Sequence, residues 1–171
     1  MKRLNIREQI LNFLFLLVLQ LPLIHKVTLF DQAFGFFYVG FLLFLPVGLS
    51  RSYLMLIGFF SGLMVDVFSN TPGLHALSCV IIMFLRNFWL SIVNSDWQEM
   101  GNVNYANLRL LGFFGYVFPL ILIHHFVLFV IENGGFHLFG LVFKRVVFSS
   151  FFTVIIIFAI NFLMSSRQRV S

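Results

Sequence analysis

Long apolar runs separated by short polar connections make up most of this chain. A helix needs about 20 residues to cross a hydrocarbon layer of roughly 30 Å, and six runs are close to that length. They cover 10–24, 33–49, 53–68, 74–93, 110–131 and 141–164. The pattern therefore predicts an all-α integral membrane protein, with six transmembrane helices in one bundle and a single polytopic domain over residues 1–171.

Two of the six runs are irregular. The first follows a basic start, as in a signal peptide, but no small-residue cleavage site follows Ile24, so we expect a retained span. The second is broken by Gly35, Gly40, Pro46 and Gly48. Such residues are tolerated in a span when neighbouring helices satisfy the freed backbone groups, and this is the least regular of the predicted helices.

The composition is typical of a chain that folds in lipid. Of the 171 residues, 60% are hydrophobic and 10% are charged, and the mean hydropathy is +1.00. Soluble domains are about 45–50% apolar and about 25% charged, which excludes a sizeable water-soluble domain here. The net charge is +5, but the basic residues are scattered between apolar blocks and form no continuous basic surface. We therefore expect membrane lipid and no nucleic acid as a partner.

The basic residues predict the orientation of the bundle. With six spans, eight of the 11 Lys and Arg residues lie on the side of the termini and three lie opposite. The first set is Lys2, Arg3, Arg7, Arg51, Arg86, Arg109, Arg167 and Arg169, and the second is Lys26, Lys144 and Arg145. Because basic residues accumulate on the cytoplasmic side, both termini are predicted to be cytoplasmic.

The third run carries a motif for close helix packing. Gly58 and Gly62 are four residues apart, a spacing that lets two helix backbones approach, and Asp66 lies one turn further on the same face. Asp66 is near the end of its helix, where the macrodipole disfavours a negative charge, so it needs a stabilising partner. Headgroup water, a basic side chain and a chemical role remain alternatives. The turn that follows contains Thr71, Pro72 and Gly73.

Ionisable residues of the later runs form a second group of candidates. With the predicted topology they lie at a depth similar to Asp66, toward the outer leaflet, and they are His75, His124, His125, Glu132, Lys144 and Arg145. Such groups indicate either function or a structural polar network. Adjacent histidines point about 100° apart, unlike the i, i+4 pairs of zinc sites, so we expect no metal. No nucleophile or phosphate-binding motif is recognisable, and we expect no cofactor and no catalytic residue.

Two further polar side chains have simple interpretations. Arg86 lies about two turns from the cytoplasmic end of its run, where a snorkelling side chain would reach the headgroups. Cys79 is the single cysteine, and we expect a small buried apolar residue.

The order of these features resembles a known family. Gly58, Gly62 and Asp66, the turn 70–76 with the sequence Asn-Thr-Pro-Gly-Leu-His-Ala, the polar loop 94–107, a histidine-bearing fifth run and a basic tail are similar to the MreD family of rod shape-determining proteins, in the short versions of the Bacteroidota. The resemblance implies a non-enzymatic protein of the bacterial inner membrane that takes part in cell-wall elongation. It also implies binding to MreC, which links the MreB cytoskeleton to RodA and its transpeptidase partner.

Two alternatives stay open. That family is similar in fold to the substrate-binding subunits of energy-coupling-factor vitamin transporters, so a small-molecule binding subunit is a second hypothesis. A membrane acyl or glycosyl transferase with His125 as the base beside Glu132 is a third.

Overall fold

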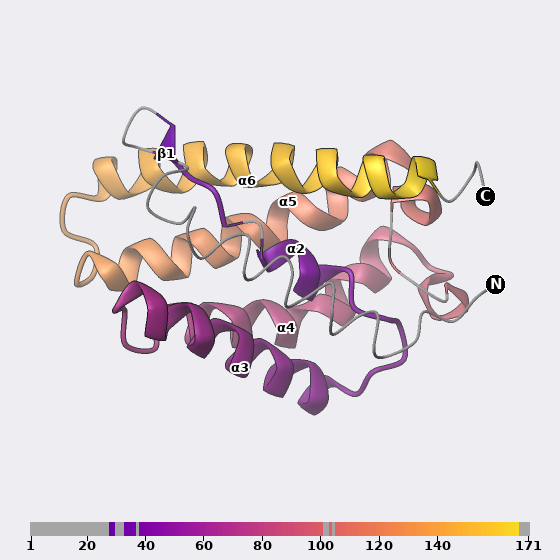
Figure 1. Cartoon of the computed structure of the whole chain (residues 1–171), viewed down its shortest axis with the longest axis horizontal. Coiled ribbons are helices and arrows are strands. Elements are labelled where there is room, and N and C mark those ends of the chain that lie inside the picture. The colour runs from indigo at the N-terminus through magenta and orange to yellow at the C-terminus, as the bar shows by residue number, and fades with distance from the viewer. Residues whose placement is uncertain (1–27, 30–32, 37, 101–102, 104, 168–171) are drawn as a thin grey trace.

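The computed structural model describes residues 28–29, 33–36, 38–100, 103 and 105–167 (Figure 1). Four long helices dominate this part: α3 (Arg51–Ser69), α4 (Leu74–Val93), α5 (Tyr105–Glu132) and α6 (Phe139–Arg167). The smaller elements are the strands β1 (Thr28–Leu29) and β2 (Ala33–Phe34), the helix α2 (Tyr38–Leu43) and the 3₁₀ turn η1 (Trp97–Glu99). The strands are antiparallel, with Thr28 opposite Phe34.

The four long helices are long and apolar enough to cross a membrane. The spans are Arg51–Ser69, Leu74–Val93, Asn107–Glu132 and Phe139–Phe162, with mean hydropathies between 1.6 and 2.2. They correspond to the last four predicted runs, and the bounds of α4 are those predicted. In α5 the backbone is non-helical at Arg109, which has a φ of 58°, so the regular span begins close to that residue. Four helices of the described residues are therefore long and apolar enough to cross a membrane, as the hydropathy pattern predicted for these runs.

The predicted second span, 33–49, is not a single helix, and this part of the prediction is wrong. The segment starts as β2 and continues without regular structure to Phe36, and only Tyr38–Leu43 is helical. Six residues of helix rise about 9 Å, far less than a bilayer needs. Pro46 ends the helix because it disfavours helical geometry at the residue before it and donates no backbone hydrogen bond.

The predicted first run, 10–24, lies outside the described residues, so the described part of the chain shows four spans and the count of six stays a prediction. The cytoplasmic location of both termini also stays a prediction.

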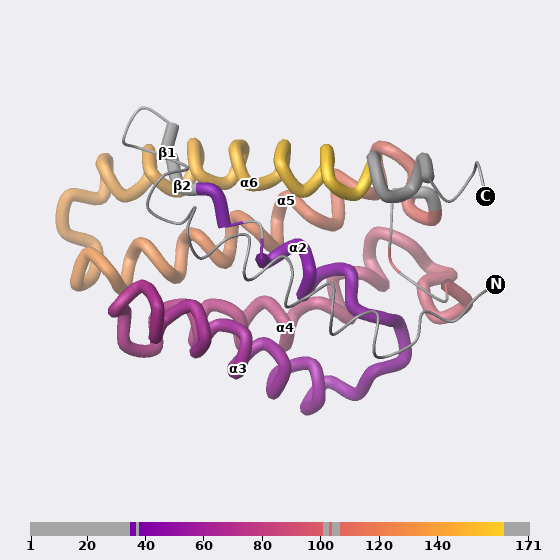
Figure 2. Tube along the Cα trace, in the orientation of Figure 1, coloured from indigo at the N-terminus to yellow at the C-terminus, as the bar shows by residue number. Residues whose placement is uncertain are grey.

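The long helices form a layer in which each packs beside the next one in the chain. Contacts join α3 to α4, α4 to α5 and α5 to α6, while β2 contacts α6 and α2 contacts α4. The tube in Figure 2 shows the segment that contains α2 running from beside α6 to the start of α3. In α2, Tyr38, Val39, Leu42 and Leu43 are fully buried, so this short helix belongs to the core.

A side-chain cap begins α3, and two left-handed residues form the turn between α3 and α4. Ser50 precedes α3 and accepts a hydrogen bond from the Tyr53 backbone N–H at 3.3 Å. At the other end Asn70 adopts a left-handed conformation, with a φ of 54°, and Gly73 does the same before α4. Two left-handed residues close together reverse the chain within four residues, as the turn composition predicted.

Arg86 holds the C-terminal end of α2 in the core. Its side chain is 0% exposed, and Nε donates to the carbonyl oxygen of Leu43 at 3.2 Å while Nη2 donates to that of Leu45. The Tyr116 hydroxyl donates to the same Leu43 oxygen at 2.7 Å. The last carbonyls of a helix lack partners within it and attract positive charge, so Arg86 caps α2. The prediction that Arg86 snorkels to the headgroups is wrong.

Replacing Arg86 should destabilise the protein through α2. In Arg86→Met the carbonyls of Leu43 and Leu45 lose their charged donor, and a buried unsatisfied group costs about 1–3 kcal/mol. We expect a loss of about 3 kcal/mol, read as a lower unfolding temperature in detergent, and a smaller loss for Arg86→Lys. The exposed Ser91→Ala in the same helix is the control, and equal unfolding temperatures for Arg86→Met and this control would contradict the capping role.

Candidate functional site

Asp66 caps the N-terminus of α4 from the helix before it. Its Oδ1 accepts from the Thr71 hydroxyl at 2.8 Å and from the His75 backbone N–H at 2.9 Å, and its Oδ2 accepts from the Ala76 N–H at 2.9 Å. The first N–H groups of a helix have no partner within it, and its dipole favours a negative charge there. The dipole of α4 therefore offsets the unfavourable position of Asp66 near the end of α3. None of the three alternatives named this partner.

The two glycines of the third run allow α3 and α4 to touch. A Cβ placed on Gly62 would lie 2.5 Å from the Ala76 Cα and 2.5 Å from the His75 oxygen. On Gly58 it would lie 2.8 Å from the Met83 Cγ and 3.1 Å from the Cys79 oxygen. Gly58 and Gly62 thus face α4 of the same chain, and together with Asp66 they set the geometry of the hairpin. Pro72 and Gly73 are exposed in its turn.

A tyrosine from α2 is the centre of the buried polar group. The Tyr38 hydroxyl lies 2.9 Å from His75 Nδ1 and 3.0 Å from His124 Nε2, and the Cys79 thiol donates to it at 3.5 Å. Tyr38, Cys79 and His124 are fully buried, and His75 is 4% exposed. Tyr38 joins α2, α4 and α5. Sequence analysis missed it, although a lone hydroxyl in a phenylalanine-rich run was a signal, since a buried hydroxyl requires a partner.

The predicted outer polar cluster is divided into two parts. His75 and His124 meet at Tyr38, whereas His125 lies nearby with Nδ1 2.8 Å from the Ile121 oxygen and Nε2 3.4 Å from the Thr153 hydroxyl. The remaining members are at the end of the α5–α6 hairpin, where they are partly or fully exposed. The predicted cluster thus has a buried part and an exposed part, and the Phe129 ring contacts His125 of the first and Arg145 of the second.

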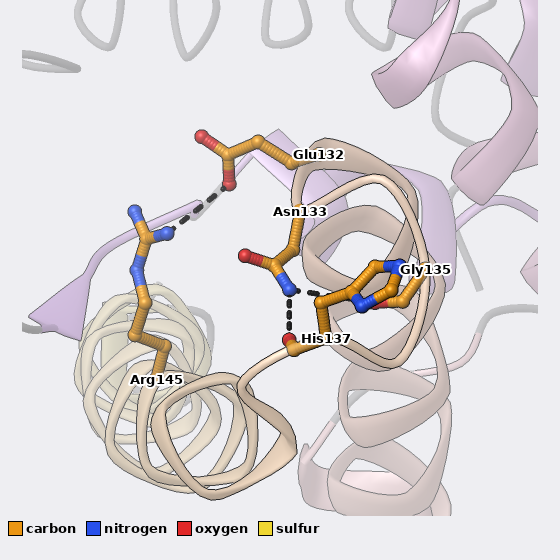
Figure 3. A network of polar contacts seen from close by, with 5 residues as sticks. All are labelled: Glu132, Asn133, Gly135, His137 and Arg145. Carbon is orange, nitrogen blue, oxygen red and sulfur yellow. Dashed lines mark hydrogen bonds and ion pairs between the residues drawn. The ribbon is translucent and has the colours of Figure 1, made fainter.

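The exposed part contains an ion pair and a tightly bonded turn (Figure 3). Glu132 Oε2 lies 3.6 Å from Arg145 Nη1, and the Arg145 guanidinium lies over the Phe129 ring. Asn133 donates to the carbonyl oxygens of Gly135 and His137, which closes the turn. Lys144 is exposed on the same hairpin. Glu132 is thus paired with Arg145, while His125 contacts the Ile121 carbonyl oxygen and the Thr153 hydroxyl.

Three buried side-chain atoms have no hydrogen-bond partner among the described residues, and one of them is Ser69 Oγ. The other two are His124 Nδ1 and Ser150 Oγ. They belong to adjacent helices, α5 and α6. In the same part of the chain, no group of three or more His, Cys, Asp or Glu residues is arranged to hold a metal ion.

Comparison with known proteins identifies no relative: no protein family matches the sequence, and no curated protein or solved structure is similar to it.

The two glycines should differ in their tolerance of a methyl group. Gly62→Ala places a Cβ 2.5 Å from backbone atoms of α4, whereas in Gly58→Ala the shortest contact is with the Met83 side chain and the nearest backbone atom, the Cys79 oxygen, is 3.1 Å away. Because overpacking costs about 1–3 kcal/mol, we expect Gly62→Ala to be near the upper value and Gly58→Ala near the lower. Unfolding temperatures in detergent measure this. Gly115→Ala is the matched control, since a Cβ there meets no atom within 4 Å. Equal tolerance at positions 58 and 62 would argue against the close approach.

Asp66 substitutions should rank by the hydrogen bonds that they keep. Asn retains one oxygen for Thr71 and His75 but turns an amide N–H₂ toward the Ala76 N–H, while Ala loses all three bonds. Loss of a helix cap costs about 0.5–2 kcal/mol, so we expect Asp66→Ala to lose more stability than Asp66→Asn. Thermal unfolding of both variants, with Asp96→Asn in the exposed loop as the control, checks the order. The reverse order would contradict a capping role.

Proposed function

We propose that this chain is a non-enzymatic scaffold of the bacterial inner membrane, similar to the MreD proteins of the cell-elongation machinery. In this proposal it binds MreC and brings it together with RodA and its transpeptidase partner, with MreB reached through MreC. Both termini lie in the cytoplasm, and membrane lipid surrounds the bundle.

The α3–α4 hairpin is the observation that carries the proposal. The residues on which the resemblance rests act in it as one unit: the glycines permit the close approach, and Asp66 with Thr71 caps α4. Loss of any of these residues changes the same piece of structure. The resemblance to the MreD family rests on these residues, and the function is inferred from it by analogy.

The bonding of the charged side chains also supports a scaffold. Asp66 and Arg86 are buried and cap helix ends, and Glu132 is paired with Arg145. Each of these groups is used to hold elements together. A scaffold needs a rigid bundle with surfaces for partners, and the loop that contains Asp96 and Glu99 is exposed to soluble proteins at one end of the bundle.

A substrate-binding subunit of a small-molecule transporter is the second candidate. The observation that favours it is the interrupted segment around α2, which brings Tyr38 among helices α4 and α5 inside the bundle. Transporters commonly place short or broken helices at their binding sites. The unpartnered His124 Nδ1 would then contact a polar group of the substrate.

Isolation of native complexes distinguishes the two candidates. The tagged protein is purified from its own membrane in mild detergent, beside a tagged membrane protein of similar size as the control. Recovery of MreC and RodA, together with rounded cells after depletion, is the expected result. Recovery of ATPase subunits would favour the transporter. Isolation of the protein alone, with normal cell shape after depletion, would contradict the scaffold.

A further inference from the structure

Three buried side chains form a continuous hydrogen-bonded path in the bundle. Tyr38 O lies 2.9 Å from His75 Nδ1 and 3.0 Å from His124 Nε2, both short enough for proton transfer along a hydrogen bond. The path begins at His75, in the first turn of α4 at the end of the bundle, and it leads to His124 in α5. His75 is the member with residual exposure, so proton exchange with water is easiest there.

The surroundings separate this path from water. The Phe36 ring packs against the two histidines of the path and against His125. The centroid distances are 5.1 Å to His75, 6.3 Å to His124 and 5.4 Å to His125. Among the described residues, the other titratable groups around the path are Asp66 from α3, Cys79 from α4 and His125 from α5, while α6 contributes the Thr153 hydroxyl. Asp66 binds the backbone N–H of His75, and its carboxylate is already occupied by the α4 cap.

Counting donors links the two imidazoles. A tyrosine hydroxyl donates one hydrogen, and its oxygen accepts from the Cys79 thiol and from one further donor. One of the two histidines must therefore donate to Tyr38 while the other accepts from it. His125 is not part of this path. Its Nδ1 must carry a hydrogen, because the Ile121 carbonyl oxygen that it contacts can only accept a hydrogen bond.

The unpartnered nitrogen of His124 selects between the two arrangements. If His124 donates from Nε2, its buried Nδ1 is a bare acceptor; if it accepts at Nε2, Nδ1 becomes a buried N–H without a partner among the described residues. Orphaned buried N–H groups are rarer than orphaned acceptors. The resting arrangement is therefore His124 Nε2–H to Tyr38, and Tyr38 O–H to His75 Nδ1.

We propose that His124, Tyr38 and His75 form a proton relay between the interior of the bundle and its end. When a proton binds His124 Nδ1, the Nε2 proton of His124 passes to the Tyr38 oxygen and the Tyr38 proton passes to His75 Nδ1. His75 then carries two protons and the positive charge, and it can release the Nε2 proton to water. One proton enters, one leaves, and Tyr38 is a hydroxyl before and after.

The relay predicts that protonation of His75 changes the tautomer of His124, which histidines that titrate independently would not show. Protonation of His75 places hydrogen on Nδ1, so Tyr38 must turn its own hydrogen to His124 Nε2. His124 must then carry its single hydrogen on Nδ1. The tautomer of His124 should therefore change without any gain of charge on that ring, at the same pH at which His75 gains its second proton.

Nitrogen-15 spectra of histidine-labelled protein in lipid bilayers test the relay. The chain has five histidines, which single His→Gln variants assign. We expect Nε2–H on both His75 and His124 at neutral pH, and a shift of His124 to Nδ1–H in parallel with double protonation of His75 on acidification. A His124 tautomer that stays unchanged while His75 becomes doubly protonated would overturn the proposal, as would a His75 that never does.

A pair of tyrosine variants separates the relay from general packing. Tyr38→Phe removes the hydroxyl of the path, and Tyr116→Phe removes another fully buried hydroxyl of the same core, one that donates to Leu43. We expect the tautomer shift of His124 to be lost in Tyr38→Phe and kept in Tyr116→Phe. Retention of the shift in Tyr38→Phe, or its loss in both variants, would show that Tyr38 does not carry the proton.

Discussion

Helix ends buried inside a protein have no water to bind, and here two buried charged side chains bind their backbone groups. Asp66 places a carboxylate at the N-terminus of α4, and Arg86 places a guanidinium at the C-terminal end of α2. Each charge lies at the helix end whose dipole favours its sign. Because unsatisfied backbone groups are especially costly in lipid, the hairpin turn and the short α2 depend on these two residues.

The cap by Arg86 explains how a segment that is too short to be a span can lie in the core. Its guanidinium and the Tyr116 hydroxyl bind the free carbonyls of α2, so the helix can end inside the bundle. This position brings Tyr38, at the start of α2, between His75 and His124. The polar centre is thus a consequence of the interrupted segment, and a regular second span would place these groups differently.

The hairpin was the part most open to prediction. Turn residues bound the third and fourth runs on both sides, and the spacing of Gly58 and Gly62 identifies the face that meets another helix. Periodicity does not identify that second helix, and the partners of Asp66 were missed because two of the three are backbone N–H groups. Such a partner has no identity in the sequence, since every residue except proline carries the same group.

The sequence by itself indicated a lipid environment, the approximate bounds of the four long helices and the turn between α3 and α4. Hydropathy, length and turn chemistry are local properties, so a single sequence carries them. Only the tertiary structure showed that Arg86 is a buried cap, that 33–49 is interrupted and that the predicted outer cluster has a buried part and an exposed part. Arg86 binds a carbonyl 43 residues away, and Tyr38 binds a histidine 86 residues away. Whether a polar side chain in lipid is buried depends on whether such a distant partner reaches it, and that is a property of the fold.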